Sequence, residues 1–343
     1  MPKIVVVGGS TGSINALKVI LSGLPQDFPA PVLIVSHIGS RESMLPDLFE
    51  SCSALPVLHA SQGAPIVAGE VMVAPSDLHL LVADDEGRPY ARLLRGPKEN
   101  HCRPAIDPLF RSAAMVYGTD AIAVLLSGFL DDGTVGIQAI KAYGGIAVVQ
   151  DPLGAEAPEM PASALSNASV DFVMNVNQIA SKLVELAGSR ATLSNTATEP
   201  LPASSDAQER IVLEVRMMEE DTGMDELERI GRLVPLTCPE CAGALWELRD
   251  TAPVRYRCHT GHAFTSKVLE SLQKHSVEDA LWAAVRALHE QERLFKQLHD
   301  KARERGQMDA GSEYQAKAEQ ARQQSQVLRE LIVARIHGFP GAG

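Results

Sequence analysis

Short apolar runs alternate with segments of helical periodicity over residues 1–188 of this chain of 343 residues. A run without polar interruption is typical of a strand buried on both faces, as in a parallel sheet covered by helices. The pattern predicts six strands, at residues 4–7, 32–35, 71–74, 121–126, 146–149 and 170–174. Between the first two, Ile14, Leu17, Leu21 and Leu24 form one stripe of a helix that ends near Gly23. We therefore expect an α/β fold: a doubly wound, mainly parallel sheet with helices on both faces.

The pattern changes after residue 188. Residues 189–208 are rich in Ser, Thr, Ala and Pro and lack hydrophobic periodicity, which predicts a flexible linker. From Ser276 apolar residues recur every three to four positions, which predicts a helix with Ser276 and Asp279 at its N-terminal cap. A second helical stretch, 312–336, is expected to pack on the first as a hairpin. The expected division is a main domain (1–188), the linker (189–208), a Cys/His module like a zinc ribbon (209–266) and a helical C-terminal region (267–343).

The charge balance narrows the range of partners. The chain has 31 Lys and Arg against 43 Asp and Glu, a formal net charge of -12. This sign does not suit a phosphate backbone, so we expect no nucleic-acid partner. No apolar run approaches the roughly 18 residues of a membrane span, and Met1 leads directly into a predicted strand without a basic leader. We expect a cytoplasmic protein without membrane insertion, in which the five cysteines suit a metal site better than a disulfide framework.

A glycine-rich turn follows the first predicted strand. The sequence Gly8-Gly9-Ser10-Thr11-Gly12 fits two chemistries and also a purely structural turn that only starts a helix. A dinucleotide site requires an acidic residue about 20 positions further on, but the second strand ends in Ser36-His37. In a G-x-S-x-G turn, the Ser10 hydroxyl is lifted above the sheet edge, and backbone N–H groups face a developing oxyanion.

A serine nucleophile needs a base, and the base needs an orienting acid. His37 follows the second predicted strand, and Asp132 follows the strand at 121–126. Because the carboxyl ends of parallel strands meet at one edge of the sheet, we expect Ser10, His37 and Asp132 to share one crevice. Taken singly, His37 also fits a loop histidine, and Asp132 also fits a turn or helix-cap residue.

Taken together, these motifs resemble the catalytic domain of the CheB protein-glutamate methylesterases over about residues 1–188. The resemblance includes the turn at 8–12, the strand that ends at His37, and the segments 73–79, 100–114, 126–133 and 144–151, the last leading to Met160-Pro161. It implies that Ser10 is the nucleophile, that His37 is the general base and that Asp132 holds the imidazole, while Asp131 has no assigned role. The implied reaction hydrolyses methyl-glutamate side chains of a chemoreceptor or related signalling protein through an acyl-enzyme, without a cofactor. Some members of the family also deamidate glutamines.

The resemblance also implies a wall around the nucleophile. Thr11 and the Gly12 backbone are placed to form an oxyanion hole, which Phe129 completes. Arg103 and Asp107 are candidates for shaping the cleft, although a surface ion pair and a helix cap explain them equally well.

The sequence departs from the family in three respects. Ser13 stands where the family usually repeats glycine, and Phe129-Leu130 replaces the usual Met-Gly pair, which alters the wall beside the nucleophile. The usual chemotaxis enzyme carries a receiver domain ahead of the catalytic domain, and we expect none before residue 1 here. We therefore expect regulation by a separate receiver or regulatory protein, or constitutive activity.

The C-terminal third contains a compact Cys/His cluster. Cys238, Cys241, Cys258 and His262 give the spacing C-x2-C-x16-C-x3-H, which favours a closed, tetrahedral, structural zinc site. His259 is the alternative fourth ligand, but Gly261 suits a knuckle turn just before His262. The cluster also fits ordinary reduced cysteines. Such a Cys/His and helical extension resembles those of some stand-alone methylesterase-like proteins, for which no activity is implied.

The sequence thus favours a serine-type methylesterase with a metal-bound extension. One alternative is a catalytically weakened interaction or regulatory protein that binds a partner through the zinc module and the helices. The other is a nucleotide-binding oxidoreductase, which His37 disfavours because an acidic ribose ligand is expected near that position.

Overall fold

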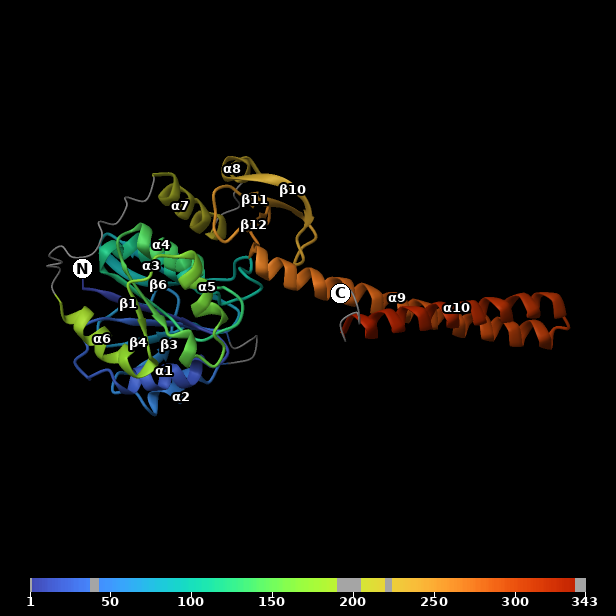
Figure 1. Ribbon diagram of the computed structural model, residues 1–343, viewed down its shortest axis with the longest axis horizontal. Helices are drawn as coiled ribbons and strands as arrows, with labels where there is room; N and C mark the ends of the chain where they lie inside the picture. Colours follow the sequence, from blue (N-terminus) through green and yellow to red (C-terminus); the bar gives the residue numbers. More distant parts are fainter. Residues whose placement is uncertain (1, 38–42, 190–204, 220–223, 337–343) are drawn as a thin grey trace. The chain divides into compact units, whose positions relative to one another are not determined.

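A parallel sheet of seven strands forms the centre of the main domain (Figure 1). The computed structural model describes residues 2–37, 43–189, 205–219 and 224–336. The strand order is β3-β4-β2-β1-β7-β8-β9, and every neighbouring pair is parallel. The bounds are β1 Ile4–Gly9, β2 Val32–Ser36, β3 Val57–His59, β4 Val71–Val73, β7 Ala121–Leu125, β8 Ile146–Gln150 and β9 Phe172–Met174. Each of the six predicted runs overlaps one of these strands, and only β3 was not predicted, so the expected α/β sheet is confirmed.

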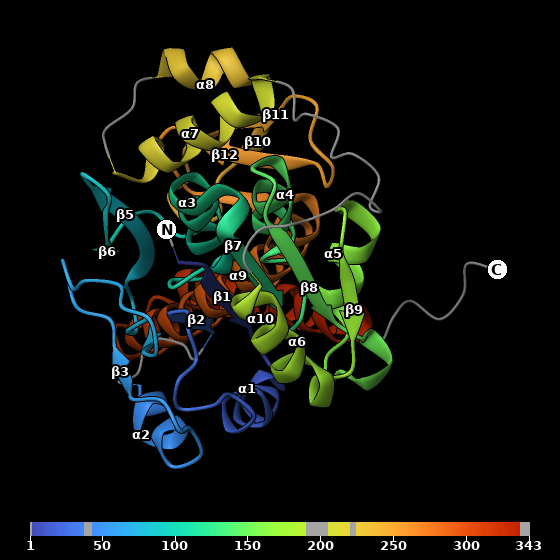
Figure 2. The same ribbon diagram turned by 90° about the vertical axis from the view of Figure 1, so that its left-hand side faces the viewer.

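Helices cover both faces of this sheet (Figure 2). Along β1, Val5 and Val7 pack on one face, whereas Ile4 and Val6 pack on the other, as the pleat requires. The first face carries α1 Ser13–Ser22, α2 Leu45–Glu50 and α6 Val176–Gly188. The second carries α3 Ile106–Tyr117, α4 Thr134–Ala142 and α5 Glu159–Asn167. The predicted doubly wound arrangement is therefore confirmed.

A hairpin that the sequence analysis did not predict follows β4. Its strands are β5 His79–Asp85 and β6 Arg88–Leu94, which pair antiparallel. The signal was a two-residue loop, Glu86-Gly87, in which both residues have positive φ (52° and 81°), as a type I′ turn requires. Two short 3-10 helices, η1 Gly118–Asp120 and η2 Pro152–Gly154, complete the main domain.

A smaller antiparallel sheet follows the main domain in the chain. Its strands, in the order β10-β11-β12-β13, are Gly231–Thr237, Ala244–Leu248, Arg255–Cys258 and Ala263–Thr265. Two helices precede it, α7 Ser205–Glu219 and α8 Met224–Ile230. We call the described part of residues 205–265 the Cys/His module. Ile211 of α7 joins the apolar cluster of α3 and α4, and residues 1–269 form one compact unit.

The second compact unit, residues 270–343, contains most of a helical hairpin. Its helices are α9 Ser266–Glu304 and α10 Met308–Ile336, and within the turn region His299 Nδ1 donates to the Gly311 carbonyl at 2.8 Å. The predicted hairpin is confirmed. The predicted helix start at Ser276 is wrong, because α9 begins at Ser266, where the Thr265 hydroxyl caps it by accepting from the Val268 N–H at 3.3 Å.

Two further expectations concern the borders of these parts. Of the predicted linker, 189–208, residues 190–204 lie outside the described residues, and α7 begins at Ser205. The predicted domain boundaries at residues 188, 208 and 266 stay predictions. In the described ranges, no helix is both long and apolar enough to cross a membrane.

Candidate active site and metal centre

Ser10 lies directly after β1, at the carboxyl edge of the sheet. The Gly9 carbonyl accepts from the His37 N–H at 3.2 Å, so the ends of β1 and β2 remain paired up to these residues. On the other side, the Ser10 N–H donates to the Ser127 carbonyl at 2.9 Å, in the loop after β7. A Cβ atom built on Gly128 would lie 2.9 Å from Cβ of Ser10, so this loop approaches the serine closely. The structure therefore brings Ser10 between the strand ends that carry His37 and Asp132.

Gly12 starts α1 with φ of 78°, a conformation that other residues rarely adopt. A Cβ atom at this position would lie 2.5 Å from Cβ of Glu156. Glycine is thus favoured at this position for two reasons, the positive φ and the close neighbour.

His37 and Asp132 form a direct contact. His37 Nε2 donates to Asp132 Oδ2 at 2.9 Å, and Asp132 is only 3% exposed. The same oxygen accepts from Ile106 N at 2.7 Å, while Oδ1 accepts from Asn100 Nδ2 at 3.1 Å. Burial raises the pKa of Asp132, but the bonds from His37, Ile106 and Asn100 lower it to about 2. At neutral pH this group is therefore a charged acceptor, as required of a residue that orients an imidazole.

The other ring nitrogen of His37 faces a thiol. Nδ1 lies 3.5 Å from Sγ of Cys102, which is half-buried. Burial lowers the pKa of His37, but the charge of Cys102 and the bond to Asp132 outweigh burial and raise this pKa to about 10. The contribution of Cys102 exists only while its thiol is ionised. The sequence analysis missed this contact, because the two residues are 65 positions apart and share no local pattern.

Phe129 and Leu130, which the sequence analysis expects in the wall beside the nucleophile, follow Gly128 in the turn after β7. Phe129 is 55% exposed, and Leu130 has φ of 65°, in the left-handed region that favours glycine. The Leu130 N–H donates to Glu159 Oε2 at 3.1 Å, which holds this turn. The departure from the usual Met-Gly pair therefore places a branched side chain where the backbone suits glycine.

The remaining predicted cleft residues have definite partners. Thr11 is exposed, and its carbonyl accepts from the Ser127 hydroxyl at 2.8 Å. Arg103 bonds Asp77 Oδ1 through Nε at 2.8 Å and the Gly96 carbonyl through Nη1 at 2.7 Å, which corresponds to the ion-pair alternative. Asp107 is buried and accepts from the Gly136 N–H at 2.6 Å. Burial and the charge of Asp132 raise its pKa well above the usual range.

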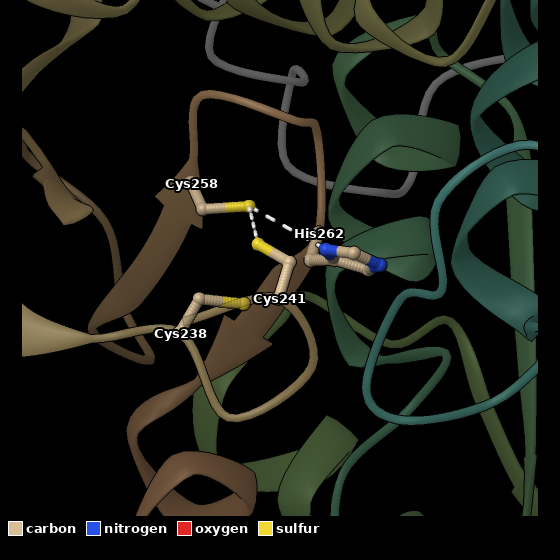
Figure 3. A group of neighbouring side chains, drawn as sticks. All are labelled: Cys238, Cys241, Cys258 and His262. Carbon is tan, nitrogen blue, oxygen red and sulfur yellow. Dashed lines mark hydrogen bonds between the residues drawn. The ribbon is translucent and has the colours of Figure 1, made fainter. Parts of the chain in front are cut away.

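The four predicted metal ligands lie together (Figure 3). The ligand atoms of Cys238, Cys241, Cys258 and His262 are all within 4.8 Å of one another. Sγ of Cys241 lies 3.7 Å from Sγ of Cys258, close to the about 3.8 Å expected for two thiolates 2.3 Å from one tetrahedral ion. In the described residues, the histidine of this group is His262, not the alternative His259.

Two tight turns present these ligands. The Cys238 N–H donates to the Gly243 carbonyl at 2.7 Å, and the Ala242 N–H donates back to the Cys238 carbonyl at 2.9 Å. In the second turn, the Cys258 N–H donates to the His262 carbonyl at 2.9 Å, and Gly261 has φ of 94°. This donor set, three thiols and one imidazole, fits a soft or borderline ion such as Zn²⁺.

Comparison with known proteins gives consistent matches to the main domain. Residues 5–183 match a family described as CheB methylesterase. A Leptospira interrogans protein, provisionally named as a protein-glutamate methylesterase and protein-glutamine glutaminase, is 40% identical over 183 residues, which is 53% of this chain and 93% of that protein. The Thermotoga maritima protein-glutamate methylesterase/protein-glutamine glutaminase is 37% identical over 186 residues, 54% of each chain. The crystal structure of the T. maritima CheB methylesterase catalytic domain matches with a TM-score of 0.53 and 36% identity, over 54% of this chain and 99% of that one.

Proposed function

Because the chain belongs to the CheB methylesterase family, we propose that it hydrolyses methyl esters of glutamate side chains in a chemoreceptor-like signalling protein. The observation that carries this proposal is the bond of 2.9 Å between His37 and Asp132 at the sheet edge where Ser10 lies. The substrate is a protein, and no cofactor takes part in the reaction. Regulation by a separate receiver protein and a cytoplasmic location stay predictions.

The reaction has two steps. His37 accepts the proton of the Ser10 hydroxyl while Oγ attacks the ester carbonyl, and the same proton then goes to the leaving methoxide, which departs as methanol. Water, deprotonated by His37, hydrolyses the acyl-enzyme and leaves a glutamate carboxylate. Asp132 stabilises the imidazolium that forms in both steps. With a glutamine side chain the same steps release ammonia, so deamidation is a second proposed activity.

The oxyanion of each tetrahedral intermediate needs donors beside Ser10. We assign this role to backbone N–H groups at the start of α1, at Thr11 and Gly12, and to the turn that carries Phe129. We assign to Arg103 a role in shaping the cleft. Residues 1–188 then form the catalytic domain.

The Cys/His module is proposed to hold a structural zinc ion through Cys238, Cys241, Cys258 and His262. Four protein ligands leave no open position, so the ion stabilises the fold and does not touch the substrate. Zinc content of the purified full chain, measured by elemental analysis, tests this assignment. One equivalent is expected in the wild type and in His259→Ala, with loss in His262→Ala; the reverse result for the two histidines would exchange their roles.

Methanol release from a methylated receptor signalling domain tests the activity. Wild type and Ser10→Ala are compared, with Ser22→Ala in α1 as the matched control, because its hydroxyl is exposed and bonds only the Val19 carbonyl of its own helix among the described contacts. Release and fluorophosphonate labelling should both vanish in Ser10→Ala and persist in the control. Full release from Ser10→Ala would refute the serine mechanism. Absence of both signals in the wild type would instead support the weakened interaction protein, for which the altered wall at Phe129 and Leu130 is the structural argument.

A further inference from the structure

The edge of the smaller sheet is completed by the main domain. The Ala263 N–H of β13 donates to the Lys98 carbonyl at 3.3 Å, and the Asn100 N–H donates to the Ala263 carbonyl at 2.8 Å. Glu99 and Ala263 form a parallel bridge between these bonds. Residues 98–100 therefore cover the edge of β13 through one parallel bridge. Within this compact unit, the module is bonded to the main domain by backbone as well as by side chains.

Buried charges lock this contact in one arrangement. Glu99 accepts from Arg111 of α3 at 2.6 Å and from Arg257 of β12 at 2.8 Å, and all three are at most 1% exposed. Glu214 of α7 bonds Arg255 Nη1 at 2.7 Å and lies 3.5 Å from Arg111 Nη1. Because separating a buried ion pair leaves an uncompensated charge, the module cannot shift on this surface without a large loss of stability.

Bonds from the module reach the two aspartates of the catalytic turn. The Thr265 N–H donates to Asn100 Oδ1 at 3.1 Å, and Asn100 Nδ2 in turn donates to Asp132 Oδ1 at 3.1 Å. The Thr265 hydroxyl donates to Asp131 Oδ1 at 2.7 Å. Thr265 is thus one bond from Asp131 and two bonds from Asp132, and it lies three residues after the proposed ligand His262.

Asn100 also has a conformation that depends on its surroundings. It is buried, with φ of 51°, and the next residue, His101, has φ of 65°. Such conformations persist where neighbouring contacts hold them. For Asn100, these contacts come from Ala263 and Thr265 of the module on one side and from Asp132 and Asp107 on the other.

We propose that the Cys/His module is a positioning element of the catalytic site: the Thr265 N–H holds Asn100, which holds the Asp132 carboxylate against His37, and the Thr265 hydroxyl holds the neighbouring Asp131. This inference rests on the proposed function and adds to it a dependence of hydrolysis on the docked module. A metal ion bound to Cys258 and His262 would hold the turn that leads directly into β13. Metal binding therefore supports catalysis without any contact with the substrate. Asn100 and Thr265 are positioning residues, because they act through Asp132.

The test uses the full chain and compares zinc-loaded protein with protein stripped by a chelator. We expect zinc removal to lower kcat for methanol release by about tenfold or more while KM stays nearly constant, a loss typical of outer-shell partners. Asn100→Ala should lower kcat similarly, and zinc removal from this variant should add little, because the link is already broken. The proposal would be overturned if the losses of kcat from Asn100→Ala and from zinc removal multiply. A kcat that rises when zinc is removed would overturn it as well.

A second set of variants tests Thr265 itself. Thr265→Val removes the hydroxyl and Thr265→Ser restores it, so kcat should fall in the first and recover in the second. The matched control is Thr251→Val, since the Thr251 hydroxyl donates to the Leu248 carbonyl inside the module. Equal kcat in Thr265→Val and the control would refute the role of the hydroxyl.

One readout does not need the proposed substrate. The ring resonances of His37 in nuclear magnetic resonance spectra report its bond to Asp132, and we expect them to shift when zinc is removed and in Asn100→Ala. If the resonances shift but the wild type releases no methanol, the positioning role stands and the proposed function fails. If methanol release and the resonances are both unchanged by zinc removal, the proposed function stands and the positioning role fails.

Discussion

Sγ of Cys102 lies 3.5 Å from Nδ1 of His37, at the ring nitrogen that the bond to Asp132 leaves available. A general base must be neutral to accept a proton, and Nδ1 is the atom available for this. Burial lowers the pKa of His37, whereas a negative charge on Cys102 and the bond to Asp132 raise it to about 10. In the proposed mechanism, a charge on this cysteine would therefore shift the pH range in which the imidazole can act.

Replacement of Cys102 by Ala should lower the pKa of His37, because the negative charge that stabilises the imidazolium is removed. The acid limb of the profile of kcat/KM against pH should then move to lower pH, by more than one pH unit. Cys52→Ala is the control, since its thiol donates to the Phe49 carbonyl in another part of the domain. An acid limb at the same pH in Cys102→Ala and wild type would show that the thiol is neutral during turnover.

The buried ion pairs around Glu99 predict a loss of stability in acid. Burial raises the pKa of Glu99, but Arg111 and Arg257 lower it more, to below its usual 4.5. A carboxylate with a lowered folded-state pKa stabilises the protein fully above its unfolded-state pKa, and this contribution is lost as the pH falls through the folded-state value. Glu99→Gln should therefore cost about 3–5 kcal/mol in free energy of unfolding at pH 7 and progressively less as the pH falls below 4.5.

Urea unfolding of wild type and Glu99→Gln at pH 7 and pH 3.5 measures this difference. Glu209→Gln is the comparison, because its pair with Arg229 is exposed on both sides and should contribute at most about 1 kcal/mol. A cost for Glu99→Gln that is the same at both pH values would contradict the linkage.

Leu130 offers a test of backbone strain in the catalytic turn. At most positions a protein with alanine is more stable than the same protein with glycine, but at the φ of 65° of Leu130 this order should reverse. Leu130→Gly should therefore be more stable than Leu130→Ala by about 1 kcal/mol, the cost of a Cβ atom in the left-handed region. Thermal unfolding of the two variants gives the comparison, and a more stable alanine variant would mean that the turn relaxes to a negative φ.

Metal removal should unfold the module and leave the main domain folded. Small Cys/His modules have little apolar core, so their folding depends on the bound ion. Amide hydrogen exchange, followed with and without a chelator, should show lost protection in β10–β13 and in α7, but retained protection in β1, β7 and β8. Retained protection of β11 and β12 without metal would show that the buried ion pairs are sufficient to hold the sheet.

The sequence predicted what local patterns determine. Unbroken apolar runs identified most of the central strands, and the positions of His37 and Asp132 after strand ends predicted that they lie at one edge of the sheet, where they bond each other. The positions of Cys102, Asn100 and Thr265 could not be predicted in this way. Cys102 contacts a residue 65 positions away, and Thr265 bonds Asp131 across 134 positions, so these contacts depend on the tertiary fold. The start of α9 is a different case, because Thr265 bonds Val268 only three residues further on, a local cap signal that the choice of Ser276 overlooked.

The bridge between Glu99 and Ala263 has a consequence for how the protein can be divided. An unpaired strand edge is a template for association with other chains, and natural proteins cover such edges. In this chain the edge of β13 is covered by residues 98–100, which come from the other side of the predicted linker. A fragment that ends near residue 188 would expose Glu99 and Arg111 to solvent, and a fragment with only the smaller sheet would expose β13. The piece with only the smaller sheet would therefore tend to self-associate through β13, so its solubility depends on residues 98–100 of the main domain.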